Sequence, residues 1–293
     1  MATLTRLVSP LAAPIVAISA GLFTTNKVES RYVSPEYESS NYEEYHLTVN
    51  TLEWLYSKAR QNRVFEFICQ ESIQRVIEIG IGAYPLSCNS SNCTPKKRLK
   101  VASVEPRSGF ILQSNFGLRN DVENKIFNAK FEEIILSEVL NFLGETPNLI
   151  VLNSILHEID DLKTFLSKLD SYVGPQTKIW VNVPNSNSLH LYAYEKLKSS
   201  QLSNISEDSF RSVLSNRKNN FSAQTLIEIF SKFGFECTHV TSFGYKPFTF
   251  GQLESLYVPE NATTLPQKET LVEMEIRELF GAELEMIFEP YGN

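Results

Sequence analysis

The feature that most constrains this chain is an uninterrupted apolar run, Leu-Ile-Val-Leu, at the end of Asn148–Leu152. A strand with one face in water alternates apolar and polar side chains, whereas a parallel strand covered on both faces is apolar throughout. The run therefore predicts a parallel strand near the centre of a sheet. A second run, Arg75–Gly80, is rich in β-branched residues and ends in glycine, which predicts another buried strand that feeds a tight turn.

Strand-like and helix-like segments alternate along the rest of the chain. The further expected strands are Leu99–Glu105, Lys125–Phe127, Lys178–Val183, Phe235–Thr241 and Ala282–Glu289. The expected helices are one or two over Tyr42–Gln70, then Gly109–Leu118, Glu132–Phe142, Asp160–Tyr172, Ser188–Lys198 and Ser222–Phe233. The last strand alternates Glu with apolar residues, so we expect it to be half-exposed. This order predicts an α/β fold: a doubly wound, seven-stranded, mostly parallel sheet with helices on both faces.

Composition excludes some classes of partner. The 27 Lys and Arg are outnumbered by 34 Asp and Glu, a net charge of −7, and 42% of the residues are hydrophobic. Nucleic-acid affinity comes mainly from clustered basic residues, and here they cluster only at 96–100, which we interpret as a solvated loop. The sequence therefore predicts an ordinary globular protein with no nucleic-acid partner.

The four cysteines form neither a disulfide framework nor a CxxC zinc motif. Cys88 and Cys93 are the only close pair. They could close a small disulfide or share a metal, but no histidine or second cysteine pair is near enough in sequence to complete a tetrahedral site. We expect free thiols in a loop and no metal.

The N-terminal segment allows two interpretations. Arg6 and the apolar run Leu7–Phe23 resemble a secretory signal with Ala20 as a cleavage residue, but Pro10 and Pro14 interrupt the run, which is also too short to span a bilayer. We favour a cytoplasmic protein without a membrane partner and keep export as the alternative. The expected organisation is an N-terminal extension and helical cap over 1–70 and a ligand-binding domain over 71–293, with a substrate-side insertion at about 184–221.

The residues that follow the strands predict a binding site. In doubly wound sheets, ligands bind beyond the carboxyl ends of the strands where the strand order reverses. Gly80–Ala83, Glu105, Asn128 and Asn153 all fall at such ends. Glycine allows a ligand to approach the backbone closely. Glu105 follows Gly82 by about 20 residues, the spacing at which a carboxylate accepts hydrogen bonds from ribose hydroxyls.

At this point the chain resembles the class I S-adenosylmethionine-dependent methyltransferases, most strongly between Arg75 and Val183. The resemblance rests on Glu78-Ile79-Gly80-Ile81-Gly82, on Glu105, and on the segment after the central strand, Asn153-Ser154-Ile155-Leu156-His157-Glu158. It implies S-adenosylmethionine as cofactor. It also implies a set of cofactor-binding residues. Glu78, Gly80 and Gly82 would contact the methionine moiety and Glu105 the ribose. Asn128 and Ala129 would contact the adenine, and Asn153 and Ser154 belong to the family's motif after the fourth strand.

The segment Tyr84–Pro95 departs from the family pattern. The family starts a helix directly after the glycine turn, whereas this segment is rich in Ser, Asn and Pro. A Rossmann-like binding module without catalytic activity therefore stays open as an alternative. A nicotinamide-dependent oxidoreductase is disfavoured because Tyr84 stands near the place of the third glycine that a pyrophosphate requires.

The transfer of a methyl group to an oxygen or nitrogen atom needs a general base only where the acceptor loses a proton. His157, just past the central strand, is the best candidate for that base, and a structural histidine is the alternative. Tyr45, His190 and Lys246 are our candidates for the acceptor pocket. No Asn-Pro-Pro-Tyr motif follows the central strand, which disfavours nucleic-acid bases as acceptors. We therefore expect a small molecule or natural-product intermediate, free or attached to a carrier.

Overall fold

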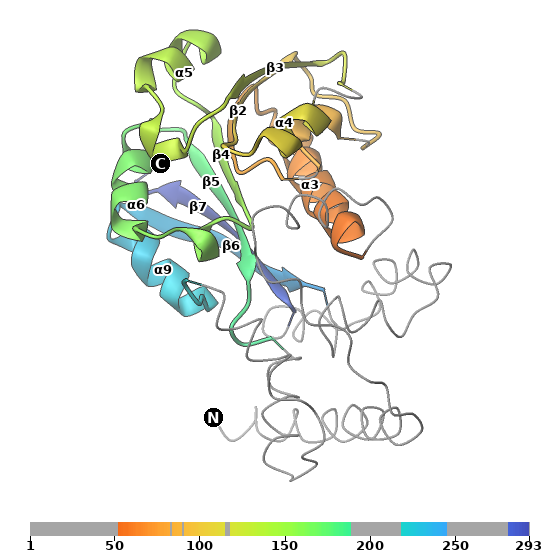
Figure 1. Ribbon diagram of the computed structural model, residues 1–293. Helices are drawn as coiled ribbons and strands as arrows, with labels where there is room; N and C mark the ends of the chain where they lie inside the picture. Colours follow the sequence, from red (N-terminus) through yellow and green to blue (C-terminus); the bar gives the residue numbers. More distant parts are fainter. Residues whose placement is uncertain are drawn as a thin grey trace, which may run out of the picture.

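The computed structural model describes residues 52–82, 84–89, 91–114, 118–188, 218–244 and 281–292. Its sheet has seven strands in the order β3-β2-β1-β4-β5-β7-β6 (Figure 1). Strands β1 to β5 pair in parallel, and β7 runs antiparallel to both β5 and β6, so that β7 alone is reversed among the seven. The predicted doubly wound, mostly parallel, seven-stranded sheet is confirmed.

The elements follow the expected alternation. The strands are β1 (Arg75–Ile79), β2 (Leu99–Val104), β3 (Val122–Phe127), β4 (Leu149–Asn153), β5 (Lys178–Pro184), β6 (Phe235–Phe243) and β7 (Glu283–Pro290). The helices are α3 (Leu52–Gln70), α4 (Ser108–Ser114), α5 (Leu136–Leu143), α6 (Leu162–Asp170) and α9 (Ala223–Ser231), with short 3-10 turns at Leu86–Cys88, Phe131–Glu133 and Leu156–Glu158.

Helix ends are set by local chemistry. The side chain of Asp161 accepts the backbone N–H of Thr164 at 3.0 Å and so begins α6. Gly144, in the left-handed conformation at φ +89°, ends α5. The helix expected from Glu132 begins only at Leu136, because Ile135 is extended and the residues before it form a separate 3-10 turn.

Helices cover both faces of the sheet. Figure 1 shows α5, α6 and α9 on one face and α3 on the other. The first face buries a large apolar cluster that includes Phe165, Phe230 and Phe288. The second face buries Phe65 and Ile68 of α3 against Val76, Val151 and Trp180. Both layers exclude water from the strands between them, as the apolar run in β4 predicts.

The last strand corrects one prediction. We expected Glu283 and Glu285 on the exposed side of a half-exposed strand, but both are buried. Helix α3 covers that side, and Arg60 and Arg63 pair with Glu283 and Glu285 at 2.6 Å each. Apolar and acidic residues do alternate along β7, but the acidic side chains face the two arginines of α3 instead of water.

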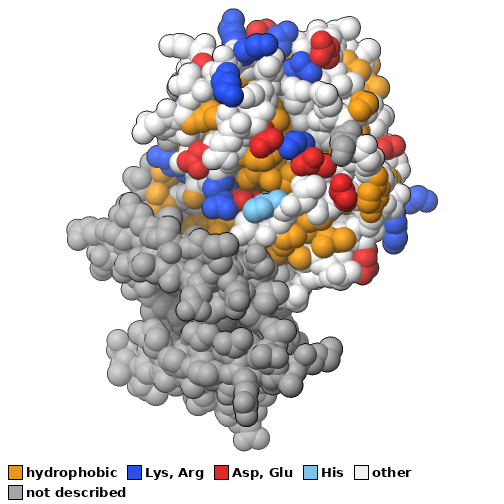
Figure 2. Space-filling view, turned by 180° about the vertical axis from the view of Figure 1, so that it is seen from behind, with side chains coloured by type: hydrophobic (Ala, Val, Ile, Leu, Met, Phe, Trp, Pro, Cys, Tyr) orange, Lys and Arg blue, Asp and Glu red, His pale blue; other side chains and the backbone are white. Residues whose placement is uncertain are grey.

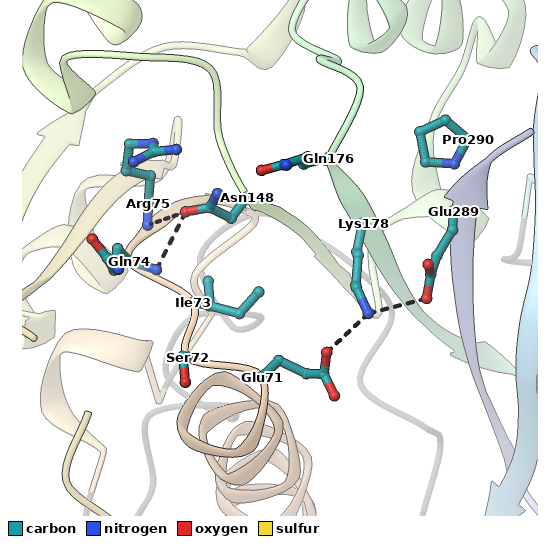
Figure 3. Close-up of a pocket in the computed structure, with 10 residues that line it drawn as sticks. All are labelled: Glu71, Ser72, Ile73, Gln74, Arg75, Asn148, Gln176, Lys178, Glu289 and Pro290. Atoms are coloured by element: carbon teal, nitrogen blue, oxygen red, sulfur yellow. Dashed lines mark hydrogen bonds and ion pairs between the residues drawn. The ribbon is translucent and has the colours of Figure 1, made fainter. Parts of the chain in front are cut away.

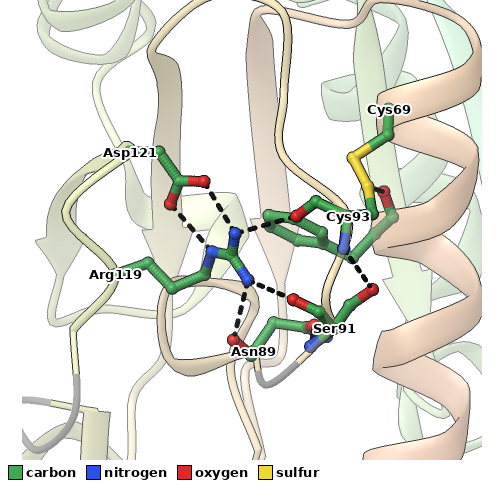
Figure 4. A network of polar contacts seen from close by, with 7 residues as sticks. Cys69, Asn89, Ser91, Cys93, Arg119 and Asp121 are labelled. Atoms are coloured by element: carbon green, nitrogen blue, oxygen red, sulfur yellow. Dashed lines mark hydrogen bonds and ion pairs between the residues drawn. A yellow bond between two sulfur atoms is a disulfide. The ribbon is translucent and has the colours of Figure 1, made fainter.

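A disulfide corrects a second prediction. Cys93 is bonded to Cys69, 24 residues earlier at the end of α3, instead of being free or paired with Cys88 (Figure 4). Cys88 and Cys237 do not take part in a disulfide. The pairing was missed because the fold, and not sequence proximity, brings Cys69 beside the segment after β1.

The described residues contain neither a candidate membrane span nor a candidate metal site. None of their helices is long and apolar enough to cross a membrane. Within the same residues, no group of three or more His, Cys, Asp or Glu side chains could hold a metal ion.

Candidate functional site

The strand order reverses between β1 and β4, because the chain runs outward from β1 to β3 and then returns to β4 on the other side of β1. The carboxyl ends of these parallel strands meet at one edge of the sheet. This edge is where a doubly wound sheet binds its ligand. The structure brings the predicted residues that follow β1, β2 and β4 to this edge.

The glycine turn after β1 has the conformation that its sequence predicts. Gly80 and Gly82 have backbone φ angles of +75° and +55°, which residues other than glycine rarely adopt. A Cβ atom at Gly80 would lie 2.9 Å from Cδ1 of Ile155, so the turn packs tightly against the segment after β4. Among the residues that the structure describes, none comes within 4 Å of a Cβ atom placed at Gly82. The described part of the chain therefore leaves space beside Gly82 at the edge of the sheet.

Glu105 follows β2 and lies against the glycine turn. Its carboxylate accepts the backbone N–H of Arg107 at 2.9 Å, and the residue is only 4% exposed. Burial raises the pKa of Glu105, an effect opposed by the backbone N–H groups of Arg107, Gly82 and Ile81. The glycine turn and the acid, 23 residues apart in sequence, are thus neighbours in space.

Glu78, the predicted acid before the turn, is fully buried. It accepts hydrogen bonds from Nε2 of Gln61 at 2.8 Å, from the backbone N–H of Leu86 at 3.0 Å and from the hydroxyl of Ser103 at 3.2 Å. Burial nevertheless raises the pKa of Glu78 to about 8. The side chain of Glu78 is therefore enclosed by protein. It fixes the positions of Gln61 and of the segment after the glycine turn through these hydrogen bonds.

The end of β4 carries polar atoms without partners. Oδ1 and Nδ2 of Asn153 are buried and make no hydrogen bond within the part of the chain that the structure describes, and the same holds for Oε1 of Gln61. Strand alternation puts Asn153 on the same face of the sheet as Glu78. Buried amides are nearly always satisfied in folded proteins, so these atoms indicate a missing polar partner at this edge.

Ser154, the residue after β4, has an unusual backbone. Its φ is +52°, in the left-handed region that non-glycine residues rarely occupy. Its N–H donates to the carbonyl of Asn182 at 2.8 Å, and its hydroxyl lies 3.2 Å from Oδ1 of the same residue. These contacts with β5 hold the sharp bend that turns the chain away from the edge of the sheet.

The remaining predicted residues differ in setting. Asn128, after β3, is exposed, and Ala129 packs partly against the core. His157 lies in the 3-10 turn after β4 and is 7% exposed, with Nε2 3.8 Å from Oε1 of Glu158. Its carbonyl accepts the backbone N–H groups of Lys218 and Asn219. Tyr45, His190 and Lys246 lie outside the described residues.

Sequence reasoning missed the contribution of α3 to this edge. Gln61 bonds to Glu78, and Trp54 packs with Ile81 of the glycine turn and with Phe110 of α4. One signal was present in the sequence. Gln61 stands three and four positions before Val64 and Phe65, on the apolar stripe of the helix, where a polar residue indicates a buried partner.

A pocket lies at the opposite edge of the sheet (Figure 3). This cavity of about 630 Å³ is lined by polar side chains around the amino ends of β1 and β5. Its one lysine, Lys178, is held between Glu71 at 3.0 Å and Glu289 at 3.1 Å. The charge of Lys178 is therefore compensated within the protein.

The surface charge fits the composition. Figure 2 shows basic and acidic side chains interspersed among hydrophobic and neutral ones on one face of the molecule. Among the described residues of that face, basic side chains have acidic ones as neighbours.

Comparison with known proteins gives structural likenesses only. No protein-family model matches the sequence, and a comparison with curated proteins gives no match. Among solved structures, the chain is similar to a SAM-dependent methyltransferase from Archaeoglobus fulgidus, with 16% identity over 85% of this chain and 97% of that chain and a TM-score of 0.48. It is also similar to the N-methyltransferase NodS from Bradyrhizobium japonicum WM9 in complex with S-adenosyl-l-homocysteine (10%, 86% and 94%, TM-score 0.48).

A third likeness is to the plantazolicin methyltransferase BpumL in complex with a triazolic desmethylPZN analog and SAH (13%, 86% and 89%, TM-score 0.49). With TM-scores of 0.49 or less and identities of 16% or less, the fold assignment rests on the strand order and not on these likenesses. The strand order itself, with β7 antiparallel between β5 and β6, gives the doubly wound, mostly parallel, seven-stranded sheet that the resemblance implies. The resemblance noted in the sequence is confirmed at the level of the fold.

Proposed function

We propose that this protein is an S-adenosylmethionine-dependent methyltransferase that acts on a small molecule. One observation carries the proposal. The edge where the strand order reverses combines an open glycine turn, a buried acid after β2 and an amide, that of Asn153, whose buried atoms have no partner. Each of these features is costly or unnecessary in a protein that binds nothing at this edge.

The polar groups of the edge match the functional groups of this cofactor. A carboxylate at Glu105 would accept hydrogen bonds from the two ribose hydroxyls. The amide of Asn153 and Oε1 of Gln61 supply one donor nitrogen and two acceptor oxygens, which suits an amino-acid moiety with both an ammonium and a carboxylate. Gly80 and Gly82 would let the backbone approach it, with Asn128, Ala129 and Ser154 as further neighbours.

The chain's own contribution to the reaction is mainly alignment. When bound, S-adenosylmethionine supplies an electrophilic methyl group that an acceptor atom takes in an in-line displacement. The protein accelerates such a step by holding the reactants in line and excluding water. His157 would accept a proton at a ring nitrogen where the acceptor is a hydroxyl, and an acceptor amine that is already neutral would make this base unnecessary.

The acceptor class is proposed on chemical grounds. The acidic composition and the mixed surface charge disfavour a nucleic acid. A small molecule or natural-product intermediate, methylated on oxygen or nitrogen, fits an enzyme of this size. Tyr45, His190 and Lys246 stay our proposed acceptor contacts.

Calorimetric titration with S-adenosylhomocysteine tests the proposal. We expect the wild-type protein to bind it and Glu105→Ala to bind it about tenfold more weakly or worse, because a charge-assisted hydrogen bond contributes about 1.5–3 kcal/mol. Glu138→Ala, which removes an exposed carboxylate from α5, is the matched control and should bind normally. Failure of the wild type to bind would leave a binding module without this cofactor, and unchanged binding by Glu105→Ala would reject the assigned role of Glu105.

A further inference from the structure

The segment that follows the glycine turn needs anchors other than a helix. Between Tyr84 and Pro95 the described residues contain one short 3-10 turn, Leu86–Cys88, in place of the long helix typical of the class I fold. A helix would hold itself in shape through its backbone hydrogen bonds. This segment, which we call the turn loop, must be held by its surroundings.

Two anchors hold the turn loop (Figure 4). The disulfide joins Cys93 in the loop to Cys69 at the end of α3, with the Cα atoms 6.5 Å apart. The guanidinium of Arg119 donates to the carbonyls of Asn89, Ser91 and Cys93 at 3.2, 2.7 and 2.9 Å. Asp121 fixes Arg119 through two hydrogen bonds at 2.8 and 2.7 Å.

The turn loop in turn supports the proposed cofactor edge. The backbone N–H of Leu86 lies 3.0 and 3.3 Å from the two oxygens of Glu78, which sits directly behind the glycine turn. Glu78 is also held by Gln61, which belongs to α3, and by the hydroxyl of Ser103. The disulfide therefore closes a covalent ring that contains β1, the glycine turn and most of the turn loop, and it ties the loop that carries Leu86 to the helix that carries Gln61.

We propose that the Cys69–Cys93 disulfide is a redox switch on cofactor binding, an inference that rests on the function proposed above. In the oxidised form the ring keeps the N–H of Leu86 on Glu78 and the glycine turn in its binding conformation. In the reduced form the turn loop loses its covalent anchor and is held by Arg119 and by the burial of Leu86. The loop then leaves Glu78 part of the time, and the protein binds S-adenosylmethionine more weakly.

The redox chemistry balances through thiol–disulfide exchange. The thiolate of a dithiol attacks one sulfur of the Cys69–Cys93 bond and forms a mixed disulfide, and its second thiolate then displaces the remaining cysteine. The products are two cysteine thiols and one oxidised dithiol. A small disulfide such as glutathione disulfide reverses the reaction. Cys69 and Cys93 are partly exposed residues at the border of the core.

The expected effect follows from the population of the binding conformation. An apparent dissociation constant is the intrinsic one divided by the fraction of competent protein. If the reduced turn loop is in place about one tenth of the time, the affinity for S-adenosylhomocysteine falls about tenfold.

The experiment compares five samples of the full chain by calorimetric titration with S-adenosylhomocysteine. They are the oxidised protein, the protein reduced with dithiothreitol, Cys93→Ser, and the control Cys88→Ser in both redox states. We expect the reduced protein and Cys93→Ser to bind about tenfold more weakly than the oxidised protein. Cys88→Ser, altered in the same loop but outside the bond, should bind normally when oxidised and respond to reduction as the wild type does.

Hydrogen exchange of the Leu86 amide provides a readout that is independent of any ligand. Its exchange should be slow in the oxidised protein and clearly faster in the reduced protein and in Cys93→Ser. Equal affinity in both redox states overturns the switch. Absence of binding in both states overturns the cofactor assignment and the switch with it, whereas binding with unchanged Leu86 exchange shows that the loop does not carry the effect.

Discussion

The two faces of the sheet differ along the length of the strands. Toward α6 and α9, the inward side chains are apolar from one strand end to the other, as in Ile77 and Ile79 of β1 or Ile150 and Leu152 of β4. Toward α3, they are apolar only in the half next to the amino ends of the parallel strands. In the half next to their carboxyl ends they become polar, and Val76 is followed by Glu78 and Val101 by Ser103.

This difference shows that the buried polar groups are concentrated beneath α3, next to the carboxyl ends of the parallel strands. The same change occurs in β5, from Trp180 to Asn182, and in antiparallel β7, from Ile287 to Glu285 and Glu283. Burying a charge without a partner costs several kcal/mol, so the polar half must be matched by donors on α3. The apolar face provides stability alone, whereas the α3 face also prepares the carboxyl edge for a polar ligand.

Arg60→Ala should produce the largest loss of stability on the α3 face. Nη1 of Arg60 lies 2.6 Å from Oε1 of Glu283, and both side chains are less than 10% exposed. Removal of the arginine leaves a buried carboxylate unpaired, which costs about 3–5 kcal/mol of unfolding free energy. Urea denaturation measures this loss.

Lys218→Ala is the control for that experiment. Lys218 pairs with Asp160, but the two side chains are 50% and 80% exposed, so the loss should stay at about 0–1 kcal/mol. A similar small loss for Arg60→Ala would show that water, and not the protein, solvates the polar half of the α3 face.

Glu78→Gln should change how stability depends on pH. Burial raises the pKa of Glu78 to about 8, so the folded protein keeps its proton between pH 4.5 and 8 while the unfolded chain releases it. The wild type should therefore lose stability as the pH rises through this window, by up to about 1.4 kcal/mol per pH unit from this group. The variant lacks this loss.

The difference in unfolding free energy between Glu78→Gln and the wild type, measured in urea at several pH values, isolates the effect from other titrating groups. It should shift in favour of the variant from pH 5 to pH 8.5. A constant difference would mean that the three donors to Glu78 keep it ionised throughout and that the polar half is better solvated than its burial indicates.

A smaller contrast compares two exchanges of similar volume on the two faces. Leu166→Met, on the apolar face, should cost less than about 1.5 kcal/mol because shape is nearly kept. Gln61→Met, equally buried on the α3 face, removes a donor from Glu78 and should cost about 1–3 kcal/mol. Thermal unfolding of both variants measures the two losses of stability. Equal losses would show that the two faces of the sheet do not differ in this respect.

The apolar face was largely predictable from the sequence. The runs that became β1 and β4 are apolar because helices cover both of their sides, so hydrophobicity alone located them. The glycine turn and Glu105 were predictable as well, since backbone freedom and a fixed spacing are local properties. Their contact with each other followed from the strand order.

The α3 face was not predictable in the same way. Glu283 reads as a solvent-facing residue until Arg60, 223 positions away, is known to cover it. The Cys69–Cys93 bond likewise depends on how α3 lies against the sheet. Pairings between distant residues leave no periodic signal, so a single sequence reveals that a polar group is present and not what compensates it.

The position of β7 has a consequence for how the chain acquires its structure during synthesis. Strand β7 is the last described strand to leave the ribosome, yet it lies between β5 and β6 in the sheet. Until Glu283–Pro290 is available, β6 has no neighbour to pair with, and Arg60 and Arg63 have no acidic partners on β7. The parallel core from β3 to β5 can assemble earlier, whereas one edge of the nascent sheet stays open and prone to wrong pairing until translation reaches β7.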